Sequence, residues 1–236
     1  MSKSLKKKLV INFIQPIATP HNNVLINQFL DEGFDLKLWY ATRNDDVKYC
    51  WKEELSNKYF HSKIYGKKLN FFFLWHCIFH KDDRYIIVGW NNINTLLLHL
   101  IFFLLRRPFN HWTDMPKPLE NKFWNFARFK RICAHFILRN SNAKIFCVGK
   151  MTVDYFKKKN FLKKNLVNLP IFVEIENNNF SKNFFFNKND YSKKNFLISA
   201  GSRLIYEKGF DLLIKSIANL PNKLKKKIKV VIVGKG

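Results

Sequence analysis

Short apolar runs rich in β-branched and aromatic residues alternate with helix-like segments along most of the chain. Runs of this length that are apolar on both faces are typical of buried parallel strands. Alternation of strand and helix predicts an α/β fold in which a Rossmann-like, doubly wound parallel sheet has helices between its strands. The expected strands of this sheet are 9–14, 36–40, 85–88, 109–112, 144–148 and 166–169.

The segments between these runs carry a helical period. One spans Val24–Leu30 and is stopped by Gly33, another is the apolar run Leu96–Leu105, and the longest is the amphipathic stretch Leu119–Arg139. Ligands of such sheets bind beyond the carboxyl ends of the strands. We therefore expect the turns 16–22, 89–92 and 112–118 to line a site.

The composition changes between Glu174 and Lys194, where Asn, Lys and Phe dominate and the periodic pattern is lost. After this stretch, 196–199 and 228–233 read as strands and 209–220 as a helix, which together make one βαβ unit. A lone βαβ unit buries too little apolar surface to form a core. We therefore expect an acceptor-side domain over 1–174, a linker over 175–194, and the incomplete start of a second Rossmann-like domain over 195–236.

The chain is strongly basic, with 42 Lys and Arg against 17 Asp and Glu, a formal charge of +25. Nucleic acid and an anionic membrane surface are two partners that would select for such a charge. The third explanation is codon bias, because Lys, Asn, Ile and Phe are all encoded by AT-rich codons. The basic residues are scattered and no nucleic-acid-binding signature accompanies them, which disfavours nucleic acid.

The cysteines and the apolar runs point to a cytoplasmic protein. Cys50, Cys77, Cys133 and Cys147 form no CxxC pair and no zinc-finger spacing with His, which is typical of reduced thiols. The first apolar run is too short for a secretory signal. The longest, Leu96–Leu105, falls short of the roughly 20 residues of a membrane span, which leaves a buried helix or a peripheral segment at the inner face of a membrane.

The turn after the strand at 196–199 carries the sharpest chemical signal. Gly201 stands where the backbone is expected to approach something closely, and Arg203 and Lys208 lie at the mouth of the following helix. Free N–H groups at a helix start attract anions, and Arg and Lys bind phosphate. The turn therefore suits a diphosphate, although an ordinary βα turn with solvated cations has the same appearance.

This segment resembles the start of the donor-binding domain of glycosyltransferase family 4. The resemblance is carried by Arg203-Leu204, Glu207-Lys208-Gly209, Leu212-Leu213 and Val233-Gly234-Lys235-Gly236, with Ser202 as an extra residue before the Arg. It implies a GT-B fold, a nucleotide-sugar donor, and binding of the donor diphosphate by Arg203 and Lys208. It also implies that these cations replace a metal, so that no cofactor is needed.

The first part of the chain resembles the acceptor domain of the same family more diffusely. His111-Trp-Thr-Asp114 is similar to a His-x-x-Asp stretch at the end of a strand beside the interdomain cleft. The resemblance places Asp114 and His111 in a catalytic role, with Asp114 accepting a proton from the acceptor hydroxyl and His111 binding a sugar or orienting Asp114. Strand-end hydrogen bonding is the alternative. Ala18–Asn22 replaces the Gly-Gly pair that the family has after its first strand.

The resemblance implies a hexosyltransferase that acts with retention at the anomeric carbon. We expect it to act in cell-envelope synthesis, on a polysaccharide, a lipopolysaccharide or another lipid-linked acceptor. The family's paired glutamates would lie beyond residue 236, so we expect the chain alone to be inactive. Two alternatives remain: a basic protein that binds nucleic acid or a membrane surface without catalysis, and a sugar-nucleotide epimerase of the same fold.

Overall fold

The computed structural model describes residues 9–41, 60–64, 69–90, 92–116, 126–172 and 196–234. The chain divides into two compact units, Met1–Ile175 and Glu176–Gly236. The stretch 175–194, which we predicted as a linker, lies outside the described residues. Each unit is described below by itself.

The first unit is built on a seven-stranded sheet with the strand order β3-β2-β1-β4-β5-β6-β7. Every neighbouring pair of strands is parallel, which confirms the predicted fold class. The strands are β1 (Val10–Gln15), β2 (Asp35–Tyr40), β3 (Phe60–Lys63), β4 (Arg84–Val88), β5 (Phe109–Thr113), β6 (Ala143–Cys147) and β7 (Leu166–Asn168).

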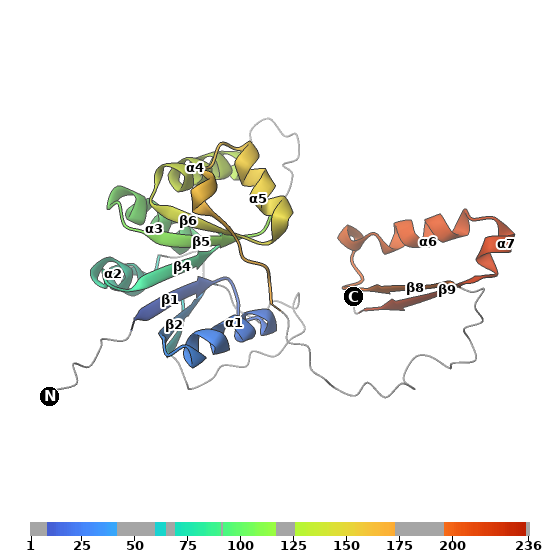
Figure 1. Cartoon of the computed structure of the whole chain (residues 1–236), viewed down its shortest axis with the longest axis horizontal. Helices are drawn as coiled ribbons and strands as arrows, with labels where there is room; N and C mark the ends of the chain where they lie inside the picture. Colours follow the sequence, from blue (N-terminus) through green and yellow to red (C-terminus); the bar gives the residue numbers. More distant parts are fainter. Residues whose placement is uncertain are drawn as a thin grey trace. The chain divides into compact units, whose positions relative to one another are not determined.

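Helices cover both faces of this sheet, as doubly wound topology requires (Figure 1). One face carries α1, and the other carries the remaining four helices, which follow the chain from β3 to β7. Right-handed crossovers produce this division, because the strand order runs outward in one direction from β1 to β3 and in the other from β4 to β7. The helices are α1 (Pro20–Asp31), α2 (Phe71–Phe79), α3 (Ile93–Leu104), α4 (Phe126–Asn140) and α5 (Gly149–Lys158).

The sheet separates two hydrophobic cores. The core under α1 contains Phe13, Ile26 and Leu38, and the core under the other four helices contains Trp39, Phe102 and Phe156. Successive residues of a strand point to opposite faces, so each buried strand feeds both cores. This explains why β1, β2 and β4 are apolar runs rather than alternating ones.

The second unit is one βαβ unit with additional short helical turns. Its strands β8 (Phe196–Gly201) and β9 (Ile228–Val233) pair in parallel, and the connection contains η3 (Tyr206–Lys208), α6 (Phe210–Ala218) and α7 (Asn222–Lys225). None of the described residues of this unit is buried. The unit as described therefore has strand pairing and helix packing but no closed core.

The strand β3 and the helix α2 of the first unit were not predicted. Both lie in stretches without a clear period. Of the helix predicted over 119–139, the structure describes Phe126–Asn140 as α4, and residues 117–125 lie outside the described part. Among the described residues, no helix is both long and apolar enough to cross a bilayer.

Candidate functional site

The order of strands reverses direction between β1 and β4, and the carboxyl ends of these strands form the switch point of the sheet. Ligands of doubly wound folds bind at this place. The loop after β1 runs over Pro16–Thr19, and the loop after β4 begins with Gly89, whose φ of 68° lies in the left-handed region that favours glycine. Both predicted turns therefore lie at the same edge of the sheet.

Gln15, the last residue of β1, places a buried polar side chain at this edge. Its Oε1 accepts a hydrogen bond from Nδ2 of Asn22 in α1. Its Nε2 is buried and has no partner among the described residues. A buried donor without a partner costs free energy, commonly 1–3 kcal/mol, and such an atom marks a place for a water molecule or a ligand oxygen.

A second buried polar group consists of two histidines that face each other between α3 and β5. Nδ1 of His99 lies 2.6 Å from the carbonyl oxygen of Thr95, and its Nε2 lies 2.9 Å from Nδ1 of His111. A carbonyl oxygen only accepts, so Nδ1 of His99 carries the proton, and neutral His99 then accepts from His111 at Nε2. This chain of hydrogen bonds fixes the tautomer of neutral His111: its Nδ1 carries the proton, and its Nε2 is an unprotonated acceptor.

That Nε2 atom of His111 is buried and has no partner among the described residues. The ring of Trp90 stacks on His111 at 4.9 Å, and the Trp90 ring also meets the edge of His135 from α4 at 5.8 Å. Nε2 of His135 is likewise buried without a partner in the described part of the chain. The indole ring of Trp90 thus contacts two imidazole rings, and each of them has a buried Nε2 without a partner among the described residues.

All three histidines are held neutral by their surroundings. Burial lowers the pKa of His99 to about 4 and lowers the pKa of His135 to about 4, the latter aided by Arg131, Lys159 and Arg139. Burial, reinforced by His99 and His135, holds the pKa of His111 well below its usual value. The imidazolium of His99 or His111 would have to form without solvent, and that of the partly buried His135 with little solvent, which is the largest cause of each shift. The described residues hold no group of three His, Cys, Asp or Glu side chains placed to bind a metal ion.

The structure separates the two residues that the sequence analysis placed together as catalytic. His111 is fully buried in β5, and its side chain lies within hydrogen-bond distance of His99 rather than of Asp114. Asp114 follows β5 directly and is exposed. Asp114 is therefore accessible at the carboxyl edge, whereas His111 ties β5 to α3 three residues earlier.

The second unit places the predicted phosphate-binding residues around the start of α6. Arg203 lies in the loop after β8, and Lys208 is the exposed last residue of η3. Gly209 caps α6 with a φ of 67°, and no side chain caps the helix. The amino end of α6 is thus preceded by both cations. Asp211, in the first turn of α6, forms an ion pair with Lys215 of the same helix at 3.8 Å.

Gly234 permits a close approach within the second unit that the sequence analysis did not predict. A Cβ atom at Gly234 would lie 2.0 Å from the carbonyl oxygen of Ser202, which the backbone does not tolerate. Gly234, directly after β9, therefore allows this strand to end close to the loop that carries Arg203. At Gly201, a Cβ atom would meet the carbonyl oxygen of Val233 at an ordinary 3.8 Å, so the protein itself makes no close approach there among the described residues.

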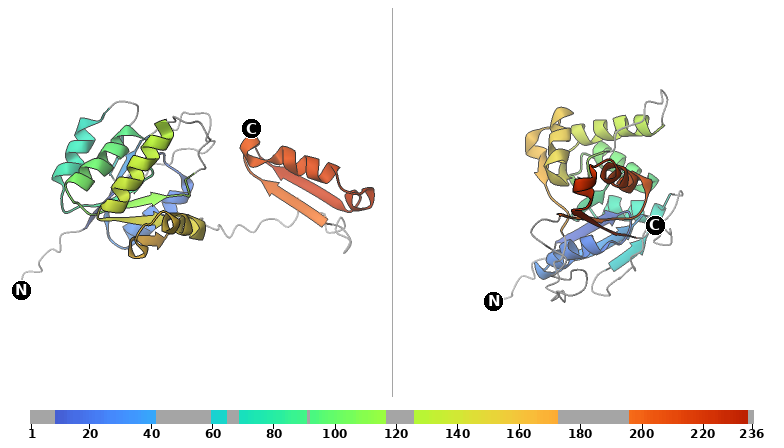
Figure 2. Two further views of the ribbon diagram at one scale, coloured as in Figure 1. Left: turned by 90° about the horizontal axis from the view of Figure 1, so that it is seen from above. Right: turned by 90° about the vertical axis from the view of Figure 1, so that its right-hand side faces the viewer.

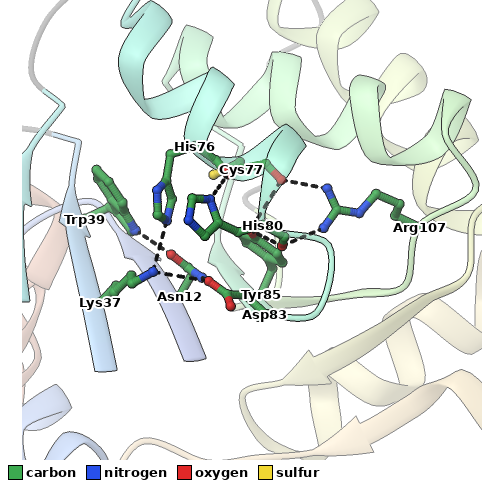
Figure 3. Close-up of polar contacts among 9 residues, drawn as sticks. All are labelled: Asn12, Lys37, Trp39, His76, Cys77, His80, Asp83, Tyr85 and Arg107. Atoms are coloured by element: carbon green, nitrogen blue, oxygen red, sulfur yellow. Dashed lines mark hydrogen bonds and ion pairs between the residues drawn. The ribbon is translucent and has the colours of Figure 1, made fainter. Parts of the chain in front are cut away.

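A polar cluster at the opposite, amino edge of the first sheet provides a contrast (Figure 3). Nδ2 of Asn12 donates to Asp83 at 2.8 Å, Nε1 of Trp39 donates to Oδ1 of Asn12 at 2.9 Å, and Lys37 pairs with Asp83 at 3.4 Å. These side chains satisfy one another. The cluster therefore fastens β1, β2 and the start of β4, and the unpaired buried atoms of this sheet lie at the carboxyl edge.

Comparison with known proteins adds a match to the second part of the chain. Residues 180–236 match the family model of the glycosyl transferases group 1. The match includes the loop with Arg203, the turn with Lys208 and the whole of α6. The second unit is thus similar to a glycosyl transferase domain.

No curated protein matches the chain as a whole. Among solved structures, the UDP-N-acetylglucosamine 2-epimerase from Rickettsia bellii matches at 13% sequence identity with a TM-score of 0.45, covering 97% of this chain and 70% of that one.

Proposed function

We propose that this chain belongs to a GT-B-type glycosyltransferase of family 4, which moves a hexose-type sugar from a nucleotide-sugar donor to a glycan or lipid-linked acceptor. The observation that carries the proposal is the match of 180–236 to glycosyl transferases group 1. Within that match, Arg203 and Lys208 precede a helix whose amino end has no side-chain cap. The donor half of the reaction is therefore assigned to the second unit.

In the proposed reaction, the bond between the anomeric carbon and the donor's phosphate oxygen breaks. The electron pair leaves with the nucleoside diphosphate, which gains negative charge as the bond lengthens. Arg203 offers a planar fork of donors, Lys208 a compact positive charge, and α6 its first N–H groups. Groups aimed at developing charge stabilise the transition state more than the ground state, so no metal is needed for this step.

On the acceptor side, we propose that Asp114 receives the proton of the attacking hydroxyl. Its carboxylate is exposed directly beyond the end of β5, where ligands of such sheets bind. The acceptor oxygen forms the new glycosidic bond, with retention at the anomeric carbon as the family resemblance implies. His111, which is buried against His99, is assigned a positioning role that fixes the strand before Asp114.

The test is turnover by the protein that contains this chain, with UDP- and GDP-hexoses as donors and release of nucleoside diphosphate as the readout. We expect Arg203→Ala to lower the rate of the chemical step by some tens- to a thousandfold, on the order of 2–4 kcal/mol. Lys208→Ala is expected to behave similarly, and the double variant to lose less than the sum because both cations hold one diphosphate. Lys208→Arg restores only part of the rate, since the two cations differ in shape.

Lys223→Ala is the matched control, because Lys223 is an exposed cation of α7 in the same unit. It is expected to keep full turnover. A folded Arg203→Ala variant with normal turnover contradicts the assignment of the donor site. Conversion of the donor sugar without any acceptor identifies an epimerase instead.

A further inference from the structure

The outer face of the first unit exposes large apolar side chains on three neighbouring helices. On α2 these are Phe71, Phe72, Trp75 and Phe79, with exposed fractions of 75%, 67%, 65% and 56%. Their spacing of one, three and four residues places them on one side of the helix. The opposite side of α2 is already buried through Phe73, Leu74 and Cys77, so the fold itself does not use these aromatic rings.

The apolar face continues across α3 and α4. α3 packs against both α2 and α4, and the left view of Figure 2 shows the three helices side by side. The rings of Phe103 and Phe136 lie 6.1 Å apart and join the second and third helices. Further members of the face are Leu100, Leu104, Phe129 and Ile132, each more than a third exposed. We call this surface, from Phe71 on α2 to Phe136 on α4, the three-helix face.

The helices α2, α3 and α4 carry basic side chains and no acidic ones. Their sequences contain no Asp or Glu. α4 carries Arg128, Lys130, Arg131 and Arg139. Arg106 is exposed directly after α3, and one acidic residue, Asp82, is exposed three residues after the end of α2. The three helices therefore combine exposed aromatic and aliphatic side chains with cations.

One arginine near this face has a structural task. Arg107 donates from Nη1 to the carbonyl oxygens of Cys77 and Ile78 at 2.6 and 3.1 Å, and from Nη2 to that of His80 at 3.0 Å (Figure 3). The hydroxyl of Tyr85 donates to the carbonyl oxygen of His80 at 2.9 Å. These bonds satisfy the last carbonyls of α2, which otherwise lack partners. The end of α2 that carries Trp75 and Phe79 is thus held in place before any partner binds.

We propose that the three-helix face docks onto the surface of an anionic lipid bilayer, with α2, α3 and α4 lying in the plane of the interface. Aromatic rings at the level of the headgroups and Arg or Lys beside them are the pattern of interfacial helices. Each cation near an anionic leaflet adds about 1 kcal/mol of attraction. The inference rests on this surface and does not depend on glycosyl transfer.

Two other occupants fit the three-helix face less well. A second copy in a symmetric contact would bring the same cations of α4 opposite one another, with no carboxylate on these helices to offset them. The phosphates of nucleic acid would pair with the arginines, but they would not shield the apolar side chains of Leu104, Ile132 and Phe136 from water. A bilayer interface accepts the apolar and the cationic part at once.

Co-sedimentation with vesicles tests the inference, using the whole 236-residue chain. Vesicles of phosphatidylcholine with 30% phosphatidylglycerol are compared with phosphatidylcholine alone, at low and at high salt. We expect binding to the anionic vesicles to be at least about tenfold tighter and to weaken with salt, because screening shortens the reach of charge. Phe72→Ser/Trp75→Ser is expected to weaken binding about tenfold or more, since two large apolar side chains are lost from the contact.

One further variant separates the contribution of the cations from that of the apolar side chains, and a second serves as a control. Arg128→Gln/Arg139→Gln keeps the apolar face and should lose only the preference for anionic vesicles. Leu212→Ser/Ile214→Ser is the matched control, because both side chains are exposed apolar residues of α6 in the second unit, and it should bind as the unchanged chain does. All substituted side chains are more than half exposed or charged, and unchanged thermal unfolding verifies folding.

Three results would overturn the inference. Equal binding to neutral and anionic vesicles removes the role of the cations. Normal binding by Phe72→Ser/Trp75→Ser removes the role of α2. Formation of a dimer in solution that this variant abolishes would show that a second copy covers the face. None of these results bears on donor turnover, so the proposed activity stands or falls separately.

Discussion

The two units differ in what holds them together. In the first, strands buried from both sides contribute to two hydrophobic cores, with Phe13, Trp39 and Phe102 almost fully enclosed. In the second, the described strands and helices form the same kind of βαβ unit, yet none of their residues is buried. The same local pattern therefore yields a core only where helices close both faces of the sheet. The chemistry that the family match supports lies in the less enclosed unit.

The largest expected effect is the difference between core substitutions in the two units. Phe102 is fully buried and its ring contacts those of Tyr85 and Phe109, so Phe102→Ala should lower the free energy of unfolding by about 3–5 kcal/mol. Leu212→Ala removes a side chain that is 63% exposed and should change it by less than about 1 kcal/mol. Urea unfolding followed by circular dichroism measures both. Equal losses of unfolding free energy in the two variants would contradict the proposed difference between the units.

A smaller effect is expected from pH, and only in the first unit. His99 and His135 have pKa values of about 4 in the folded state, below the usual 6.5 of an unfolded histidine. The unfolded chain therefore binds more protons between these values. The stability contribution is complete above pH 6.5 and is lost as the pH falls toward 4. The described residues of the second unit contain no histidine.

Unfolding midpoints measured between pH 7.5 and 4.5 check this dependence. His99→Gln serves as the comparison, because it removes one of the buried imidazoles while keeping a side chain that forms hydrogen bonds. Its midpoint should fall less steeply with acid than that of the unchanged chain. Identical slopes for the two proteins would mean that the histidine cluster does not carry the pH dependence.

Periodicity in the sequence predicted much of the fold, for physical reasons that are local. Val10–Gln15 and Arg84–Val88 are short apolar runs and form buried strands. α2 was missed because Phe71–Phe79 is apolar on all sides and so has no helical period, and its outer face stays exposed. β3 was missed because Phe60–Lys63 is a short edge strand with polar residues.

Partners that lie far apart in the chain could not be predicted in the same way. The family resemblance paired His111 with Asp114 through a His-x-x-Asp stretch. In the structure, the packing of α3 on β5 gives His111 the partner His99 instead. No spacing rule links His99 to a strand twelve residues later in the chain. Gly234 was similarly recognised only as part of a motif. That a side chain at this position would collide with the backbone of Ser202 depends on the pairing of β8 and β9.

The central claim is that the loop after β8 and the start of α6 bind the diphosphate of a nucleotide-sugar donor. The most direct measurement is a titration of the isotopically labelled chain with UDP, GDP and inorganic pyrophosphate, followed by backbone amide NMR. The account predicts shifts concentrated in residues 202–212, binding that is about tenfold or more weaker in Arg203→Ala, and no change in Lys223→Ala. An absence of shifts in these residues, or equal affinity of the Arg203→Ala variant, would contradict it.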